Sequence, residues 1–276
     1  MVFSASVVIF NTNKDDLRNC LQSLLNSKMI GTIVLVNNGK PVNIELNDSR
    51  IHLIQNENNI GYGSAQNIAV NYVTKHFSYK YHIFCNPDIT FNELIIEKSY
   101  NFLQQNQNVG MLGPKITFPD GNLYPSARLL PSAVSQFCRF FLKPAAKFFK
   151  YELNDYKYDK ELEIPFICGA FSIVRMNVFK DIGFFDERFF LYQEDIDFSR
   201  RVHKKYRTVI YPQIHVVHKL GRESHKKIRV MIYHAISVIK FYNKWGWIFD
   251  KERKNINHNC LESLRKLYSK RRSYDV

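Results

Sequence analysis

The sequence has no Cys-x-x-Cys pair and no long apolar run. Its five cysteines lie far apart among 276 residues, so their spacing gives neither a zinc site nor a disulfide framework. We expect reduced, mostly buried thiols in a cytoplasmic protein. The longest nearly apolar run, residues 164–174, is much shorter than the roughly 20 residues of a membrane-spanning helix. The apolar start lacks a basic lead and stops at Asn11, so no signal peptide is expected.

Acidic residues are scarce relative to basic ones. The 25 Asp and Glu stand against 39 Lys and Arg, which gives a formal net charge of +14. Such an excess indicates an anionic partner: nucleic acid, a phosphorylated ligand or anionic lipid. A nucleic-acid-binding module is the distant alternative, because no zinc spacing, RNP-like aromatic motif or helix-turn-helix signal supports it. We therefore expect no nucleic-acid partner.

Strand and helix signals alternate over the first 115 or so residues. The expected strands are residues 5–10, 32–36, 51–55, 81–85, 109–116, 164–174, 208–211 and 214–217, and the expected helices include 64–74, 92–105, 194–206 and the chain from 228 onward. The early βαβα order predicts an α/β fold with a mostly parallel sheet flanked by helices. Prolines make the pattern irregular beyond Phe118.

Three of the expected strands end in polar turn residues, at 11–13, 37–39 and 86–88. Ligands of an open parallel sheet bind at the carboxyl ends of its strands, although Asn, Gly and Pro also form ordinary turns. Asp88 could bind Mg²⁺ or Mn²⁺ beside a diphosphate, or cap the next helix. The loop 59–67 opens a helix whose N-terminus attracts phosphate, but it lacks the third glycine of a dinucleotide fingerprint.

A second group of polar residues surrounds Glu194 and Asp195. These carboxylates lie at an expected helix N-terminus, where acidic residues are favoured in any case. The preceding residues 184–192 are strongly aromatic, and acids beside an aromatic surface suit a carbohydrate site with a general base. His215 and His218 have no strong metal-site spacing, so a single ligand or phosphate contact from His218 and a structural role both stay open.

Taken in chain order, these segments resemble family 2 glycosyltransferases of the GT-A fold, in particular the bacterial rhamnosyltransferase-like branch. The segments that carry the resemblance are residues 6–11, 36–38, 59–63 with Asn67, 86–88, 168–170 and 183–197. The resemblance implies a GT-A domain over 1–225, with a Rossmann-like nucleotide-sugar-binding half at about 1–118 and an acceptor half at 119–225. Residues 226–276 are expected to form a basic, helical, membrane-associating extension.

The resemblance also implies an inverting transfer from a nucleotide-diphosphate sugar to a hydroxyl group. Asp195, beside Glu194, would be the catalytic base, and Asp88 with His218 would bind Mn²⁺ or Mg²⁺. The residues implied at the donor are Phe10, Asn11, Asn38, Asn59, Gly61, Tyr62, Asn67, Asn86 and Pro87, and those implied at the acceptor are Arg128, Cys168, Gly169 and Tyr192. A nucleotidyltransferase is disfavoured because residues 10–13 contain no glycine.

Two positions depart from the family pattern. Asn37 stands where the family often has Asp, and Asn86 replaces the first acid of its DXD-type motif, which removes one charged metal ligand. A catalytically inactive relative that only binds ligand therefore stays open. Residues 123–131 look like the acceptor side of rhamnosyltransferases, which favours dTDP-L-rhamnose as donor, with UDP-galactose, UDP-glucose or UDP-N-acetylglucosamine as alternatives.

Two basic segments suggest a membrane surface. Residues 134–151 interleave Phe with Lys and Arg, and residues 251–276 carry eight Lys and Arg against three Asp and Glu. Such segments suit an anionic bilayer, and a solvated helix face is the alternative. Acceptors in this family are typically lipid-linked saccharides of surface polysaccharides such as O-antigen or capsule. We therefore expect peripheral binding to the inner face of the cytoplasmic membrane; the oligomeric state stays open.

Overall fold

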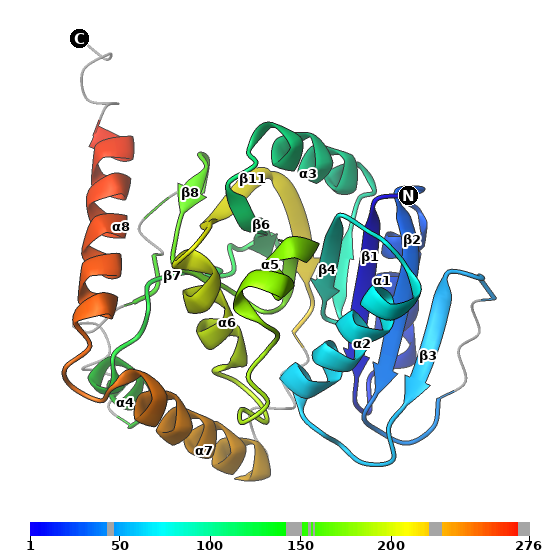
Figure 1. Ribbon diagram of the computed structural model, residues 1–276, viewed down its shortest axis with the longest axis horizontal. Coiled ribbons are helices and arrows are strands. Elements are labelled where there is room, and N and C mark those ends of the chain that lie inside the picture. The colour runs from blue at the N-terminus through cyan, green and yellow to red at the C-terminus, as the bar shows by residue number, and fades with distance from the viewer. Residues whose placement is uncertain (43–46, 142–150, 154–155, 157, 221–227, 270–276) are drawn as a thin grey trace.

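A computed structural model describes residues 1–42, 47–141, 151–153, 156, 158–220 and 228–269. Within these residues a nine-stranded sheet forms the centre of the molecule (Figure 1). Its order is β3 (Ile51–Gln55), β2 (Ile30–Asn37), β1 (Phe3–Ile9), β4 (Tyr81–Cys85), β10 (Phe171–Arg175), β6 (Val109–Thr117), β11 (Arg207–His218) and β5 (Ile89–Phe91), with β8 (Leu162–Glu163) beside β11. A separate pair joins β7 (Ala127–Arg128) to β9 (Phe166–Ile167).

The two halves of the sheet differ in strand direction. Strands β3, β2, β1 and β4 are parallel, whereas β10 runs antiparallel to both β4 and β6. Strand β11 is parallel to β6 and antiparallel to β5 and β8. All seven residues of β1 are buried, as expected for a strand covered on both faces. The expected α/β sheet is confirmed, and its parallel part is the N-terminal half plus the β6–β11 pair.

Helices cover both faces of the sheet. The described helices are α1 (Lys14–Leu25), α2 (Tyr62–His76), α3 (Leu94–Gln105), α4 (Ala133–Phe141), α5 (Met176–Ile182), α6 (Glu194–His203), α7 (Ile228–Trp245) and α8 (Lys251–Ser269). Helices α1 and α3 pack in one core cluster, and α2, α5 and α6 contribute to clusters on the opposite face. The Asn13 side chain caps α1 by accepting from the backbone N–H groups of Asp15 and Asp16.

Two strand predictions were wrong in detail. Residues 164–174 were expected to form one strand, but the chain turns at Cys168–Ala170 between β9 and β10. Residues 208–211 and 214–217 were expected as two strands, but they form the single strand β11. Its register to β6 shifts between Tyr211 and His215, around Pro212, which has no N–H to donate. The turn at residues 168–170 matters because it lies at the candidate site.

The C-terminal region is helical, as expected. Helix α7 ends at Gly246, which has a φ of 97°, and α8 packs Cys260 and Leu264 into the core cluster that includes Leu162. Arg200 of α6 pairs with Asp250 at 2.6 Å and Glu252 at 2.8 Å. None of the helices described here is both long and apolar enough to cross a membrane. Residues 142–150 and 270–276, which include much of the two predicted membrane segments, lie outside the described residues.

Candidate active site

The predicted site residues come from both halves of the sheet and meet at one edge of it. Parallel strands β1, β2 and β4 end there, and the antiparallel strand β10 begins there. The Asn86 N–H, just after β4, donates to the Ala170 carbonyl at 2.8 Å, which joins the end of one strand to the turn before the next. The convergence expected from strand order is therefore present in the structure.

Tyr62, the first residue of α2, bridges the two halves of this edge. Its hydroxyl lies 3.1 Å from Asn86 Oδ1 and 3.1 Å from the Gly169 carbonyl oxygen. Burial raises the pKa of Tyr62, so the phenol stays protonated and can donate. Asn86, at the first position of the Asn-Pro-Asp motif, thus holds Tyr62 with its side-chain oxygen.

Asparagine side chains shape the loops after β1 and β2. Asn38 Nδ2 donates to the Gly61 carbonyl at 3.0 Å, and Asn38 Oδ1 accepts from Asn56 at 2.7 Å. Asn59 Oδ1 accepts from the Gly61 N–H at 3.0 Å. Asn11 has a φ of 50°, and the preceding Phe10 is 53% exposed. Hydrogen bonds thus connect Asn38 and Asn59 to Gly61, and Pro87 after β4 is partly exposed.

Gly61 has to be glycine for two reasons. Its φ of 90° is a conformation that L side chains rarely adopt. A Cβ atom there would also collide with the Phe190 carbonyl, which instead accepts from the Tyr62 N–H at 3.0 Å. This close approach attaches the donor loop to the aromatic segment 184–192.

Asn67, predicted to bind the donor, contacts the aromatic segment 184–192 in the structure. It is buried, its Nδ2 donates to the Phe185 carbonyl and to Glu187 Oε1, both at 2.9 Å, and its Oδ1 accepts from the Phe185 N–H at 2.9 Å. These bonds occupy both ends of the amide. Asn67 therefore fixes segment 184–192 onto α2, and its described contacts are to protein rather than toward a donor space.

The two predicted catalytic carboxylates begin α6. Asp195 Oδ2 accepts from the Gly169 N–H at 3.1 Å, and Oδ1 accepts from the Ile196 N–H at 2.9 Å. Burial raises the pKa of Asp195, while these bonds and Arg128 lower it in part because they stabilise the ionised form. A Cβ atom on Gly169 would lie 3.0 Å from Asp195 Cβ, so glycine permits this contact.

Glu194 is in a drier environment than its neighbour. It is 5% exposed, and its Oε2 has no hydrogen-bond partner among the residues that the structure describes. Burial and the adjacent Asp195 raise the pKa of Glu194 well above its ordinary range. When the pair shares one negative charge, that charge belongs on Asp195, which has two N–H donors. The two carboxylates thus differ in environment: Asp195 accepts two N–H hydrogen bonds, whereas Glu194 Oε2 has no described partner.

Asp88 and His218 form the predicted metal-binding pair. His218 Nε2 lies 3.3 Å from Asp88 Oδ1, and the pairing of His218 with Ile89 brings the end of β11 beside the motif. Buried His218 Nδ1 has no described hydrogen-bond partner. The described residues contain no group of three His, Cys, Asp or Glu that could hold a metal. Because Mg²⁺ is usually held by one or two carboxylates plus substrate phosphates, the pair fits a site that the diphosphate completes.

The acceptor side contains one residue that the sequence did not single out. The Tyr124 hydroxyl lies 3.4 Å from Arg128 Nη2 and 3.7 Å from Cys168 Sγ, and its ring packs edge-on against His218 at 5.4 Å. Tyr124 therefore links His218 to the predicted acceptor residues Arg128 and Cys168. Its only sequence signal is its position within residues 123–131.

Tyr192 joins the site to the C-terminal helices. Its φ is 64° and that of Gln193 is 69°, so two left-handed residues precede the carboxylates. The Tyr192 ring packs on His234 of α7 at 4.5 Å, and Gln193 Nε2 lies 3.3 Å from His234 Nε2. Sequence reasoning did not find His234, since a histidine within an apolar helical pattern has no distinguishing spacing.

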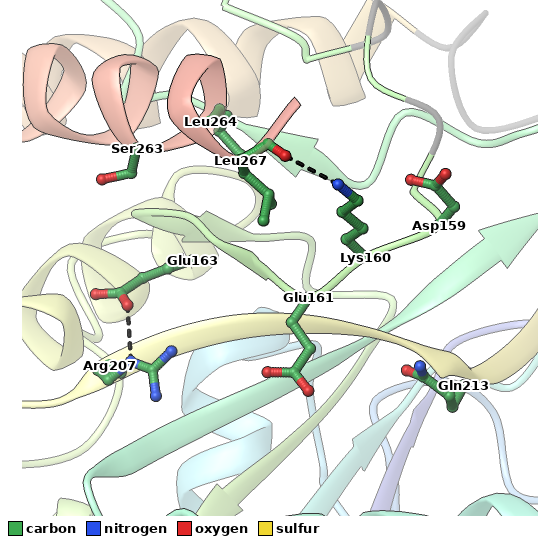
Figure 2. A pocket seen from close by; sticks show the side chains of 9 residues that line it. All are labelled: Asp159, Lys160, Glu161, Glu163, Arg207, Gln213, Ser263, Leu264 and Leu267. Atoms are coloured by element: carbon green, nitrogen blue, oxygen red, sulfur yellow. Dashed lines mark hydrogen bonds and ion pairs between the residues drawn. The ribbon is translucent and has the colours of Figure 1, made fainter. Parts of the chain in front are cut away.

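A separate hollow of about 530 Å³ lies between β8, β11 and α8 (Figure 2). Its charged side chains are partly paired: Arg207 bonds Glu163 at 2.7 Å, and Lys160 donates to the Leu267 carbonyl at 2.9 Å. None of its lining residues belongs to the predicted site. The hollow is therefore separate from the predicted site residues.

A sheet edge that joins asparagine-rich loops to a carboxylate pair suits sugar transfer, and the comparisons with known proteins agree. The profile of Glycosyl transferase family 2 matches residues 4–183. The chain belongs to this family, which confirms the expected membership and the α/β fold.

Two relatives give finer comparisons. An N-acetylglucosaminyl-diphospho-decaprenol L-rhamnosyltransferase of Mycobacterium tuberculosis is 28% identical over 61% of this chain and 58% of its own length. The low-salt glycan biosynthesis hexosyltransferase Agl10 of Haloferax volcanii is 24% identical over 74% of this chain and 63% of its own length. The chain thus spans about three-fifths of the length of these curated relatives.

Solved structures support the fold. Residues 1–349 of S. aureus TarS in complex with UDP-GlcNAc match 95% of this chain and 72% of that chain, with a TM-score of 0.58 and 15% identity. GalNAc-T7 with UDP, GalNAc and Mn²⁺ matches 79% of this chain and 43% of its own, with a TM-score of 0.60 and 14% identity. At these identities the likeness concerns the fold alone.

Proposed function

We propose that this chain transfers a sugar from a nucleotide-diphosphate sugar to a hydroxyl group with inversion at the anomeric carbon. One observation carries the proposal: Asp195 accepts two N–H hydrogen bonds beside the buried Glu194, at the same sheet edge as Asp88 and the donor loops. In-line attack at the anomeric carbon needs a base on the acceptor side and charge neutralisation at the leaving diphosphate.

In this mechanism Asp195 removes the proton of the attacking hydroxyl. The Gly169 and Ile196 N–H groups hold its two oxygens in place. Arg128, partly buried beside Tyr124, favours the ionised form of Asp195. Asp88 and His218 would hold a bound Mn²⁺ or Mg²⁺, which supplies positive charge next to the diphosphate. The loops around Asn38 and Gly61 would surround the nucleotide.

The donor that we propose first is dTDP-L-rhamnose. The mycobacterial relative named as an L-rhamnosyltransferase supports this choice. A UDP-hexose is the alternative, supported by the fold shared with TarS, whose structures include complexes with UDP and UDP-GlcNAc. We propose a lipid-linked saccharide as acceptor, in the synthesis of a bacterial surface polysaccharide such as O-antigen or capsule, at the inner face of the cytoplasmic membrane.

A combined binding and transfer experiment tests this function. Thermal unfolding is recorded with dTDP- and UDP-sugars, with and without Mn²⁺, because a ligand of the folded state raises its Tm. The best donor is then used for transfer to a diphosphate-linked saccharide on a short alkyl chain. We expect Asp195→Asn to lower kcat about 10²- to 10⁴-fold and to leave the donor-induced Tm shift unchanged.

The control is Asp120→Asn, an exposed carboxylate in a surface turn, which should leave kcat unchanged. Substantial turnover by Asp195→Asn would move the base to another residue. If no dTDP- or UDP-sugar stabilises the protein, the proposed donor class is wrong.

A further inference from the structure

Helix α7 has an exposed apolar side. Its 18 residues contain no Asp or Glu. Exposed apolar side chains recur at helical spacing and continue beyond the end of the helix: Ile228, Met231, Ile232, Ile236 and Ile239, followed by Trp247, Ile248 and Phe249. We call these eight residues the α7 apolar face. Ile228 is 73% exposed and Phe249 is 88% exposed, so this surface is available for contact.

The opposite side of α7 is attached to the catalytic segment. The Tyr233 ring packs on Phe190 at 4.3 Å. Lys244 Nζ lies 2.6 Å from a carboxylate oxygen of both Asp186 and Asp197. Trp245 Nε1 also donates to Asp197 at 2.8 Å. One side of the helix thus holds the segment that precedes and includes the α6 carboxylates, while the α7 apolar face points away from these contacts.

We propose that the α7 apolar face docks onto the surface of an anionic lipid bilayer, with α7 lying in the plane of the interface. Helices of this kind insert an apolar side about 5–10 Å into the boundary between headgroups and acyl chains. The inference rests on the proposed function in one respect: a lipid-linked acceptor would require the protein to work at a membrane. Figure 1 shows α7 along the lower edge of the view, below α6.

Charge and aromatic residues favour lipid over a protein partner. The cations Arg229, Lys251 and Lys254 are exposed at the two ends of this surface, and α7 itself has no acid that anionic lipid would repel. Trp247 lies at one end of the apolar face, and Trp is enriched at membrane interfaces. A second copy of the chain would bring the same cations toward one another, which opposes self-association.

The exposed apolar side chains of α7 add a second candidate to the membrane contact predicted for residues 134–151 and 251–276. In the described part of residues 134–151, Val134 and Phe137 are exposed. In α8, Cys260 and Leu264 are buried against the rest of the protein. The exposed side chains of α8 are polar. The basic charge of the C-terminal region can still attract the membrane, but the apolar insertion belongs to α7 and residues 247–249.

Co-sedimentation with vesicles tests the proposal. The full chain is mixed with vesicles of equal parts phosphatidylglycerol and phosphatidylcholine, and with vesicles of phosphatidylcholine alone. We expect binding to the anionic vesicles, weakened by salt and by the loss of phosphatidylglycerol. The double variant Ile232→Glu with Ile236→Glu should reduce partitioning by about tenfold or more, because two inserted side chains become charged. The matched control is Leu53→Glu with Leu94→Glu, two exposed leucines on β3 and α3, which should bind like the unchanged chain.

Each outcome has a distinct meaning. Equal loss of binding in the control pair, or none in the α7 pair, overturns the docking surface. An unchanged donor-induced Tm shift shows that the α7 variant is folded and binds donor. A dimer in analytical ultracentrifugation that dissociates only in the α7 variant, without vesicle binding, would assign the face to a second copy. If vesicle binding depends on α7 but no nucleotide sugar binds, the proposed function fails and the docking surface stands.

Discussion

The donor and acceptor halves of the sheet edge are built from different chemical groups. In the donor half, the uncharged side-chain amides of Asn37 and Asn38 donate to backbone carbonyls of the loops, and that of Asn56 donates to Asn38. In the acceptor half, ionisable groups dominate, from the Glu194 and Asp195 pair to the buried Arg200 and its partner Asp250. Amides fix a loop without adding charge, and a diphosphate can approach such a surface without repulsion.

The charges of the acceptor half also hold its helices together. Arg200 is 1% exposed, donates to both oxygens of Asp250 at 2.6 and 2.8 Å, and lies over the Trp245 ring at 4.0 Å. Burial alone would raise the pKa of Asp250, but Arg200 and Arg253 together outweigh burial and lower it. A single guanidinium therefore links α6 to both C-terminal helices. The donor half also has an ion pair, Arg50 with Asp48 at 3.0 Å before β3, but its side chains are 20% and 30% exposed, so it is less buried than the Arg200 pair.

The largest expected effect on stability comes from removing this cation. Arg200→Met removes both guanidinium hydrogen bonds from the buried carboxylate of Asp250 and leaves it only Arg253, which should lower the free energy of unfolding by about 3–5 kcal/mol. Urea unfolding followed by circular dichroism measures the change. Arg188→Met is the control: Arg188 pairs with Asp186 but is half exposed, so the expected loss is about 1 kcal/mol or less.

A second variant tests the physical reason. Arg200→Met combined with Asp250→Asn removes the uncompensated charge and should recover part of the lost stability. If Arg200→Met is no more destabilising than Arg188→Met, the acceptor half does not depend on its buried charges, and the contrast between the halves is wrong.

The order of the donor-half strands could be predicted from the sequence, because continuous β-branched runs alternate there with helical patterns. Residues 51–55 and 81–85 were predicted with the bounds that the structure has. The turn at Cys168–Ala170 could not be predicted, because Gly169 interrupts a run that is otherwise apolar on both sides. In the structure this turn presents the Gly169 N–H to Asp195, a contact between segments 26 positions apart.

The site residues fall into two groups in the same way. Residues that follow strands, such as Asn38 and Asp88, could be placed at the edge from topology alone. Contacts between distant segments could not: Asn67 with Phe185, Tyr124 with Cys168 and His234 with Gln193 depend on packing across more than 40 positions of chain. The exposure of α7 was equally hidden, because its periodic apolar pattern also fits a buried helix.

An intermediate effect is expected from a charge introduced into the donor half. Asn37 is buried, and its Nδ2 donates to the Lys40 carbonyl at 2.7 Å and to Gln55 Oε1 at 2.8 Å. Asn37→Asp restores the acid common in the family but cannot donate, so it should destabilise the fold by about 1–3 kcal/mol. Urea unfolding measures this, with the exposed Asn19→Asp of α1 as control, expected to change stability by about 0.5 kcal/mol or less. A stable Asn37→Asp protein would show that the amide is not needed for the loop.

The smallest effect, a shift in pH dependence, tests how the acceptor half sets its base. Burial raises the pKa of Asp195, and Arg128 counteracts part of that rise. Arg128→Gln should raise the pKa of Asp195 further, so the acidic limb of kcat/KM should move to higher pH. Arg128→Lys keeps the charge and should leave the limb in place, even if acceptor binding weakens.

The contribution of Asp195 to stability should fall as pH rises, whereas its activity as a base should increase. An acid whose pKa is raised by folding favours the folded state while it is protonated, and this contribution is lost as pH rises through the folded pKa. The stability that Arg128→Gln loses relative to the unchanged chain should therefore be larger at high pH than at low pH. At low pH Asp195 is protonated and cannot act as a base. An acidic limb that stays in place in Arg128→Gln, or moves equally in Arg128→Lys, would show that Arg128 acts by contact with the acceptor. In that case charge in this half would serve binding and would not tune the base.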